Sequence, residues 1–264
     1  MLATLAPARR RLVLLALLAG LLGVLVAVAV GVVRLTATLP PVAQDDPGPV
    51  LLVSGYGGST RALDPVRETL AGDGRDVVVV PPVSGGTGDI AVQARALDRA
   101  ADDAMSRFDA GSVDVVGYSA GGVVAREWVR RAGGAGKARR VLSVGSPQHG
   151  TSVAELAAGV AGRCPTACRQ LEPDSTLLRA LNARDETPDG PRFVSVWSAT
   201  DEVVVPPDSA RLDGAVNLTV QSVCPGARTS HADLPADPVV LALLDSALGV
   251  DPPAAPTDVA CAEG

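Results

Sequence analysis

Short hydrophobic runs alternate with longer amphipathic stretches from residue 50 to the end of the chain. The runs are rich in valine and are often bounded by glycine or proline, which is typical of buried strands in a parallel sheet. They cover residues 50–54, 76–80, 113–117, 140–145, 192–198 and 215–220. Helices are expected at about 60–72, 89–108, 119–133, 151–160, 174–183 and 237–248. This alternation predicts an α/β fold, a mostly parallel sheet with helices on both faces.

The N-terminus has a different pattern, because residues 12–33 form one apolar run without any charge. Arg9, Arg10 and Arg11 precede the run, and Arg34 ends it. As a helix this run would extend about 33 Å, which matches a hydrocarbon core about 30 Å thick. The basic flank favours a cytoplasmic N-terminus and an extracytoplasmic remainder. The sequence therefore predicts a transmembrane helix ahead of the folded part.

Three segments follow from these patterns. We expect residues 1–35 to be a signal anchor; a cleaved signal peptide is the alternative, although its apolar region is usually about 7–15 residues. Residues 36–49 contain four prolines and predict a linker. Residues 50–264 then form one extracytoplasmic domain, either held at the cell membrane or secreted.

Composition narrows the class of protein further. A hydrophobic share of 47% excludes an intrinsically disordered chain. The net charge of −6 and the lack of a basic block give no reason to expect nucleic-acid binding. Aromatic residues make up 2% of the chain, so the core must consist of valine, leucine and alanine. We expect a monomer.

The four cysteines lie after the apolar N-terminal run. An even number in an exported chain predicts two disulfides, for which three pairings are possible. We favour Cys164–Cys168, which closes a small loop, and Cys224–Cys261, which ties down the C-terminal tail. A metal site is disfavoured, because the Cys-x3-Cys spacing lacks the usual partner ligands and the chain has 2 histidines.

One motif carries chemistry, the G-x-S-x-G sequence formed by Gly117, Ser119 and Gly121. It follows a predicted strand and precedes a predicted helix, which is the setting that a nucleophile elbow requires. The two glycines would allow the sharp turn, and the helix N-terminus would favour a developing negative charge. A glycine-rich turn without catalytic function is the alternative interpretation.

A serine nucleophile needs a base and an orienting acid. His231 follows the last predicted strand, and Asp201 directly follows the strand at 192–198. The chain order Ser119, Asp201, His231 is that of α/β-hydrolases. Glu202 is the nearest substitute for Asp201. A surface histidine and a solvated aspartate in a turn are the alternatives.

An oxyanion hole requires two backbone N–H donors. One is expected from Ala120, the residue after the nucleophile. The other is expected from Tyr56, in the glycine-rich loop 54–59 after the first strand. A plain glycine turn is the alternative for that loop.

With these motifs the chain resembles the α/β-hydrolase superfamily, and most of all its bacterial secreted lipase and esterase branch. The resemblance rests on residues 52–58, 117–122 and 145–151 and on the Asp201 and His231 loops. Ser54 stands where many of these lipases have histidine. The resemblance implies that His149 is structural, that carboxylic esters are hydrolysed, and that no metal or organic cofactor takes part.

The predicted function is therefore ester hydrolysis through a Ser119–His231–Asp201 triad and an acyl-enzyme. The substrate would be a lipid or a small acyl ester. Residues 151–189 could form a cap beside the acyl pocket, or a simple packed crossover. An acyltransferase or thioesterase with the same triad remains open, as does a catalytically silent binding module at the cell surface.

Overall fold

The chain folds around one sheet in the computed structural model, which describes residues 11, 15–26, 28, 42–160, 164–257 and 259–261. Within these residues the sheet has six strands in the order β2-β1-β3-β4-β5-β6, and every neighbouring pair is parallel. The strands are β1 (Val50–Val53), β2 (Val77–Val79), β3 (Val113–Tyr118), β4 (Ala138–Val144), β5 (Arg192–Trp197) and β6 (Val216–Thr219). All of their carboxyl ends therefore lie at one edge.

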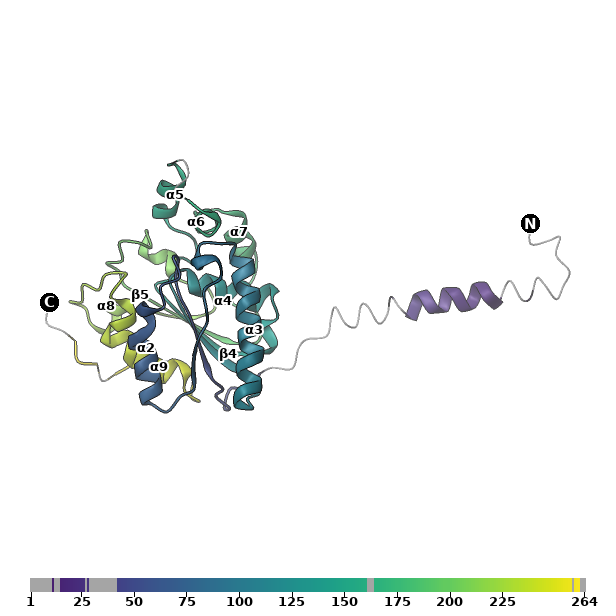
Figure 1. The fold of residues 1–264 in the computed structure, drawn as a ribbon, viewed down its shortest axis with the longest axis horizontal. Helices are drawn as coiled ribbons and strands as arrows, with labels where there is room; N and C mark the ends of the chain where they lie inside the picture. Colours follow the sequence, from purple (N-terminus) through teal and green to yellow (C-terminus); the bar gives the residue numbers. More distant parts are fainter. Residues whose placement is uncertain are drawn as a thin grey trace. The chain divides into compact units, whose positions relative to one another are not determined.

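Helices cover both faces of the sheet, as the alternating pattern predicts. Helices α3 (Ile90–Phe108) and α4 (Ala120–Arg131) pack on one face, and α2 (Asp64–Gly72) and α9 (Pro238–Leu248) pack on the other (Figure 1). Strand β1 contributes to the hydrophobic cores on both faces of the sheet. Leu51 packs in the core under α3 and α4, and Leu52 packs in the core under α2 and α9. This is the α/β-hydrolase architecture, so the predicted fold class is confirmed for the described domain.

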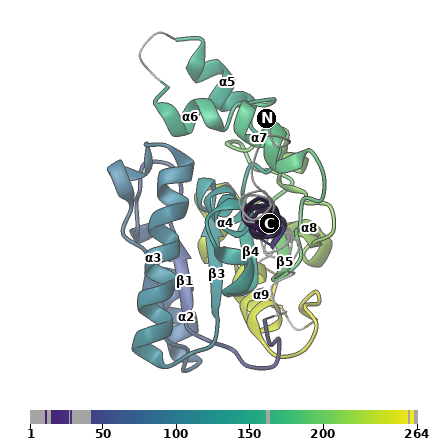
Figure 2. The same cartoon turned by 90° about the vertical axis from the view of Figure 1, so that its right-hand side faces the viewer.

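Three short helices lie beyond the carboxyl edge of the sheet, within the segment predicted as a cap or crossover. They are α5 (Ser152–Ala158), α6 (Thr166–Gln170) and α7 (Thr176–Asn182). Figure 2 shows α5 and α6 beyond the ends of the strands. The remaining elements are α8 (Val220–Val223) and the 3-10 turns η2 (Arg61–Leu63), η3 (Val83–Gly86), η4 (Gly134–Gly136), η5 (Pro207–Ala210) and η6 (Leu234–Ala236).

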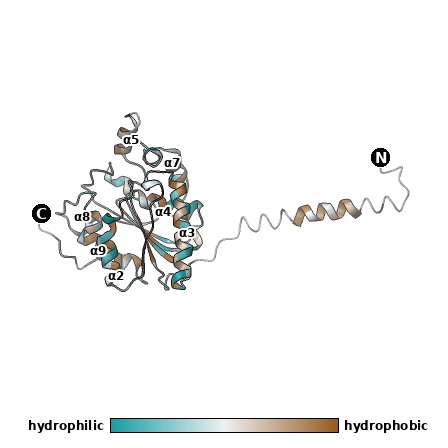
Figure 3. Ribbon diagram, in the orientation of Figure 1, coloured by the Kyte–Doolittle hydropathy of each residue, from teal (hydrophilic) through white to brown (hydrophobic). Residues whose placement is uncertain are grey.

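The N-terminal unit, Met1–Pro40, separates from the unit Pro41–Gly264. In the predicted transmembrane run, residues 15–26 and 28 are helical, and their leucines and valines are more than half exposed. Figure 3 shows the apolar character of this helix. Residues 12–14, 27 and 29–33 lie outside the described residues, as do residues 36–41 of the predicted linker. In the part that is described, no helix combines the length and hydrophobicity needed to cross a membrane.

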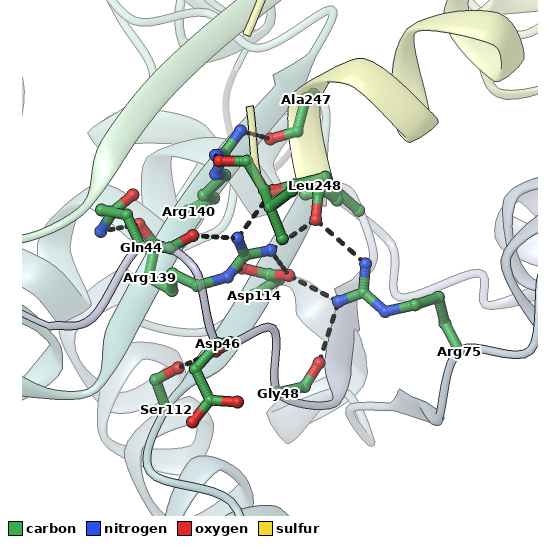
Figure 4. Close-up of polar contacts among 12 residues, drawn as sticks. Gln44, Asp46, Gly48, Arg75, Ser112, Asp114, Arg139, Arg140, Ala247 and Leu248 are labelled. Atoms are coloured by element: carbon green, nitrogen blue, oxygen red, sulfur yellow. Dashed lines mark hydrogen bonds and ion pairs between the residues drawn. The ribbon is translucent and has the colours of Figure 1, made fainter. Parts of the chain in front are cut away.

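Residues 42–49, within the predicted linker, form neither helix nor strand. They are nevertheless held against the amino ends of the strands by a buried charge cluster (Figure 4). Asp114 accepts hydrogen bonds from Arg139 at 2.5 Å and from Arg75 at 2.6 Å. Arg139 also donates to the Gln44 carbonyl and Arg75 to the Gly48 carbonyl, each at 2.9 Å. The chain thus enters the domain at the edge opposite the carboxyl ends.

Both disulfides have the favoured pairing. Cys164, just before α6, bonds to Cys168 within α6, and Cys224 bonds to Cys261 near the C-terminus.

Candidate active site

Ser119 occupies the sharp turn between β3 and α4. Its backbone has φ 54° and ψ −126°, a left-handed conformation that is uncommon for a residue other than glycine. The flanking glycines are required sterically. A Cβ at Gly117 would lie 2.5 Å from the Gly122 nitrogen, and one at Gly121 would lie 2.3 Å from the Val53 oxygen. The turn therefore has the geometry of a nucleophile elbow.

Two further predicted residues meet Ser119 at the carboxyl edge. His231 Nε2 lies 3.0 Å from Ser119 Oγ, and His231 Nδ1 lies 2.7 Å from Asp201 Oδ2. Asp201 follows β5 and His231 follows α8, so three separate loops contribute to the group. A proton on Nδ1 would be donated to Asp201, which leaves Nε2 free to accept a proton from the serine.

The Asp201 carboxylate is fixed by its own loop. Its second oxygen, Oδ1, accepts hydrogen bonds from the N–H groups of Val203 and Val204, both at 2.8 Å. The alternative acid, Glu202, does not contact the His231 ring. Its carboxylate instead accepts a hydrogen bond from the His231 backbone N–H at 3.1 Å. Asp201 is therefore the carboxylate beside the imidazole.

Tyr118 holds the other end of the His231 backbone. Its hydroxyl donates to the His231 carbonyl at 3.0 Å, and the two ring centroids are 5.2 Å apart. Burial, together with the negative charges of Asp201, Glu202 and Asp233, raises the pKa of Tyr118 to about 12. The phenol therefore stays protonated and remains a hydrogen-bond donor. No signal in the sequence points to Tyr118, because its partner lies 113 residues away.

The two predicted oxyanion donors lie on either side of the serine. Ala120 begins α4, and Tyr56 lies in the loop after β1. That loop passes close to the elbow, since a Cβ at Gly55 would lie 2.8 Å from Ser119 Cβ. Within the described residues, neither the Tyr56 N–H nor the Ala120 N–H donates to another protein group. Both therefore remain the candidate donors for an oxyanion.

An apolar cavity of about 180 Å³ adjoins Ser119. Segments of the predicted cap form much of its wall. The lining residues are Tyr56, Ser119, Pro147, Thr151, Val153, Ala154, Ala157, Cys168, Leu171, Val203 and Val204. The cavity offers space for an alkyl group next to the serine.

His149 lies outside this group, as the sequence resemblance implies. Its Nε2 is 2.8 Å from Glu186 Oε1, and its Nδ1 is 3.3 Å from the Ser209 carbonyl oxygen. The hydrogen bond to Glu186 raises the pKa of His149. Burial opposes the change at Glu186, but hydrogen bonds from His149 and from the Asp213 N–H lower the pKa of that carboxyl. The pair joins the end of the cap segment to the loop after β4.

Arg126 is a second anchor that the sequence did not reveal. It lies on α4, is 2% exposed, and donates to the Gln148 side chain at 3.1 Å and to Asn182 Oδ1 at 2.9 Å. Its other acceptors are the carbonyls of Gln148, Leu181 and Glu186. Burial lowers the pKa of Arg126 to about 10, which leaves it charged at neutral pH. The base of the cap segment is thus bound to the helix that begins at the elbow.

In the described part of the chain, no group of three or more histidine, cysteine or acidic side chains is arranged so that it could hold a metal ion.

Comparison with known proteins adds family information to this geometry. Residues 104–233 match the family model described as Lipase (class 2). No curated protein matches the chain by sequence.

Solved structures give the fold. Lipase B of Aspergillus fumigatus superposes with a TM-score of 0.69 at 19% identity, over 80% of this chain and 54% of that one. The chain therefore spans about half the length of that lipase. The mature form of lipase BlEst2 of Bacillus licheniformis superposes with a TM-score of 0.58 at 18% identity, over 75% of this chain and 90% of that one. A Listeria innocua protein superposes with a TM-score of 0.56 at 15% identity, over 77% of this chain and 94% of that one.

Proposed function

We propose that the chain is a carboxylic ester hydrolase of the class 2 lipase family and that it cleaves acyl esters with Ser119 as nucleophile; the family model that matches residues 104–233 and the similar fold of solved lipases support this proposal. His231 is the general base, and Asp201 orients and stabilises its imidazole. The observation that carries the proposal is the chain of hydrogen bonds, 3.0 Å and 2.7 Å long, that ends at the elbow serine.

The first half of the reaction acylates the enzyme. As Ser119 Oγ attacks the ester carbonyl carbon, its proton passes to His231 Nε2. The carbonyl oxygen becomes negative and accepts hydrogen bonds from the Tyr56 and Ala120 N–H groups. The bond to the alcohol then breaks, and the alcohol leaves with the proton from Nε2. An ester between Ser119 and the acyl group remains.

The second half repeats these steps with water. His231 Nε2 takes a proton from water, whose oxygen attacks the acyl carbon. Collapse of the second tetrahedral intermediate returns the proton to Ser119 Oγ and releases the carboxylic acid. No external cofactor is needed for the proton balance.

We also propose that residues 1–35 hold the enzyme at the cell membrane, with the catalytic domain outside. Exposed leucines and valines on the described helix support this, because the described residues of its unit do not bury them. The two disulfides are typical of exported proteins. Fractionation of expressing cells tests the proposal: the chain should remain in membranes and lose its catalytic domain to external protease. Release of a shortened chain into the medium would favour a cleaved signal peptide.

Hydrolysis of p-nitrophenyl butyrate by the full chain tests the enzymatic proposal. Ser119→Ala should lower kcat by about 10⁴-fold or more without changing the melting temperature. A folded wild-type chain that reacts with a fluorophosphonate but hydrolyses no ester would instead indicate an acyltransferase. A folded chain that does neither would indicate a binding module.

A further inference from the structure

We infer that the inner face of α5 makes the enzyme selective for short acyl chains, with Ala154 and Ala157 setting the limit. The inference rests on the proposed function, because it assigns the cavity beside Ser119 to the acyl group. It goes further by naming the residues that decide which esters are cleaved.

The position of His231 indicates which half of the ester enters the cavity. The leaving alcohol receives its proton from His231 Nε2, so the alcohol must lie beside that ring. His231 does not line the cavity, whereas Ser119 and Tyr56 do. A carbonyl held between Ser119 Oγ and the Tyr56 N–H therefore directs its acyl chain into the cavity and its alcohol toward His231.

The size of the cavity limits the acyl chain. Its volume is about 180 Å³. Sites for drug-sized ligands usually measure about 300–1,000 Å³. The cavity is smaller than such sites and therefore favours short acyl chains over long ones.

Two alanines on α5 create this space. Ala154 and Ala157 are three residues apart, so they share one face of the helix, and both line the cavity. Leu156 does not line the cavity and is 73% exposed. A larger side chain at position 157 would occupy the volume that the acyl group needs.

The wall formed by α5 is fixed from its N-terminal end. The Thr151 hydroxyl caps the helix at the Val153 N–H, donates to the Val203 carbonyl at 2.6 Å, and accepts from the Val205 N–H at 3.0 Å. The Ser152 N–H donates to the Val205 carbonyl at 2.9 Å. These bonds join α5 to the loop that carries Asp201.

A second support comes from the disulfide. Cys164 Sγ and Cys168 Sγ lie 3.8 Å and 4.0 Å from the Ala154 carbonyl oxygen. Cys168 itself lines the cavity. Both supports hold α5 against the cavity, which is why we assign the size limit to this wall.

The test measures kcat/KM of the full chain for p-nitrophenyl esters of two to sixteen carbons. In the wild type, kcat/KM should rise up to about fourfold per methylene until the cavity is full, and then fall for long chains. Ala157→Leu should lower kcat/KM for the hexanoate at least tenfold and leave the acetate within twofold. Leu171→Ala, at the cavity wall, should move the optimum to longer chains. Leu156→Ala is the matched control and should keep the wild-type profile.

Two further measurements separate the inference from the proposed function. The rate of inactivation by fluorophosphonates with an ethyl or an octyl group on phosphorus measures chain selectivity without turnover. Ala157→Leu should slow inactivation by the octyl reagent and leave that by the ethyl reagent unchanged. Ala157→Val should show the same effect, but smaller, if the leucine variant does not fold. Acetate esters of longer alcohols should be hydrolysed equally by wild type and Ala157→Leu.

An unchanged acyl profile in active Ala157→Leu and Leu171→Ala variants would overturn the inference and leave the esterase proposal intact. A fall in kcat/KM of Ala157→Leu that is confined to the acetate esters of longer alcohols would overturn it too, because the cavity would then hold the alcohol. A folded wild-type chain that neither hydrolyses esters nor reacts with fluorophosphonates would remove both proposals.

Discussion

His231 is held by three side chains, each at a different point. Asp201 binds the ring at Nδ1, Glu202 accepts from the backbone N–H, and Tyr118 donates to the backbone carbonyl. Neighbouring acidic residues thus have separate tasks, because one bonds to the imidazole and the other to the main chain. At the residue scale, the position of His231, the proposed base, therefore depends on both carboxylates.

Exchanging each acidic residue for its amide separates the two tasks. Asp201→Asn should lower kcat by about 10⁴-fold, because the amide favours the wrong imidazole tautomer. Glu202→Gln keeps an oxygen that can accept from the His231 N–H, so kcat should fall less than tenfold. Steady-state rates with p-nitrophenyl butyrate decide between them. Equal losses in both variants would contradict the assignment of Asp201.

Tyr118→Phe removes the hydroxyl that binds the His231 carbonyl. The lost hydrogen bond corresponds to about 1 kcal/mol, so we expect kcat to fall about fivefold while KM stays constant. The pH profile of kcat should change as well, because the imidazole is less well oriented. Unaltered kcat and pH profile would show that Tyr118 serves packing alone.

At the scale of elements, the cap segment is attached to the body at several points. Arg126 binds carbonyls near its end, and the His149–Glu186 pair bridges it to the loop after β4. Thr151 joins its beginning to the Asp201 loop. These attachments hold residues 151–189 against the domain, where several of them line the cavity.

The His149–Glu186 pair should make stability depend on pH. The pKa of His149 is raised above its ordinary value of 6.5, so its stabilisation is complete below that pH and is lost as the pH rises through the raised pKa. The pKa of Glu186 is lowered from 4.5, so its stabilisation is lost as the pH falls through the lowered pKa.

The expected result is a difference in unfolding free energy between wild type and His149→Gln that is larger at about pH 5.5 than at about pH 8.5. Urea denaturation monitored by fluorescence measures it at each pH. A difference that does not vary with pH would contradict the ion-pair interpretation.

The strands were predictable from sequence because each is a buried valine-rich run; β1 and β5 were predicted to within one residue at each end. The elbow was predictable because its glycines and serine are contiguous. Helix α6 was missed, since its five residues are too few to show a helical period. The contacts of Tyr118 and Glu186 join residues distant in sequence, so only the folded chain brings them together.

At the scale of the whole domain, the two edges of the sheet have different roles. The carboxyl edge carries Ser119, Asp201 and His231, whereas the amino edge holds the entering chain through Asp114 and its two arginines. Asp114 is fully buried. The proposed catalytic residues and the residues 42–49 that lead into the domain therefore lie at opposite ends of the strands.

Asp114→Asn should destabilise the domain strongly without altering the chemistry. It leaves Arg139 buried without its negative partner, and breaking such a pair costs about 3–5 kcal/mol of unfolding free energy. Urea titration measures the loss, while kcat of the folded fraction should remain within twofold. A loss below about 1 kcal/mol would show that the cluster contributes little.

The central claim, that Ser119 is a nucleophile activated by His231, is tested most directly by reacting the full chain with a fluorophosphonate and locating the adduct by mass spectrometry. We expect one adduct per chain, on Ser119, and at least a thousandfold slower reaction in His231→Ala, because the serine then lacks its base. A folded wild-type chain without an adduct, or with its adduct on another residue, would contradict the claim.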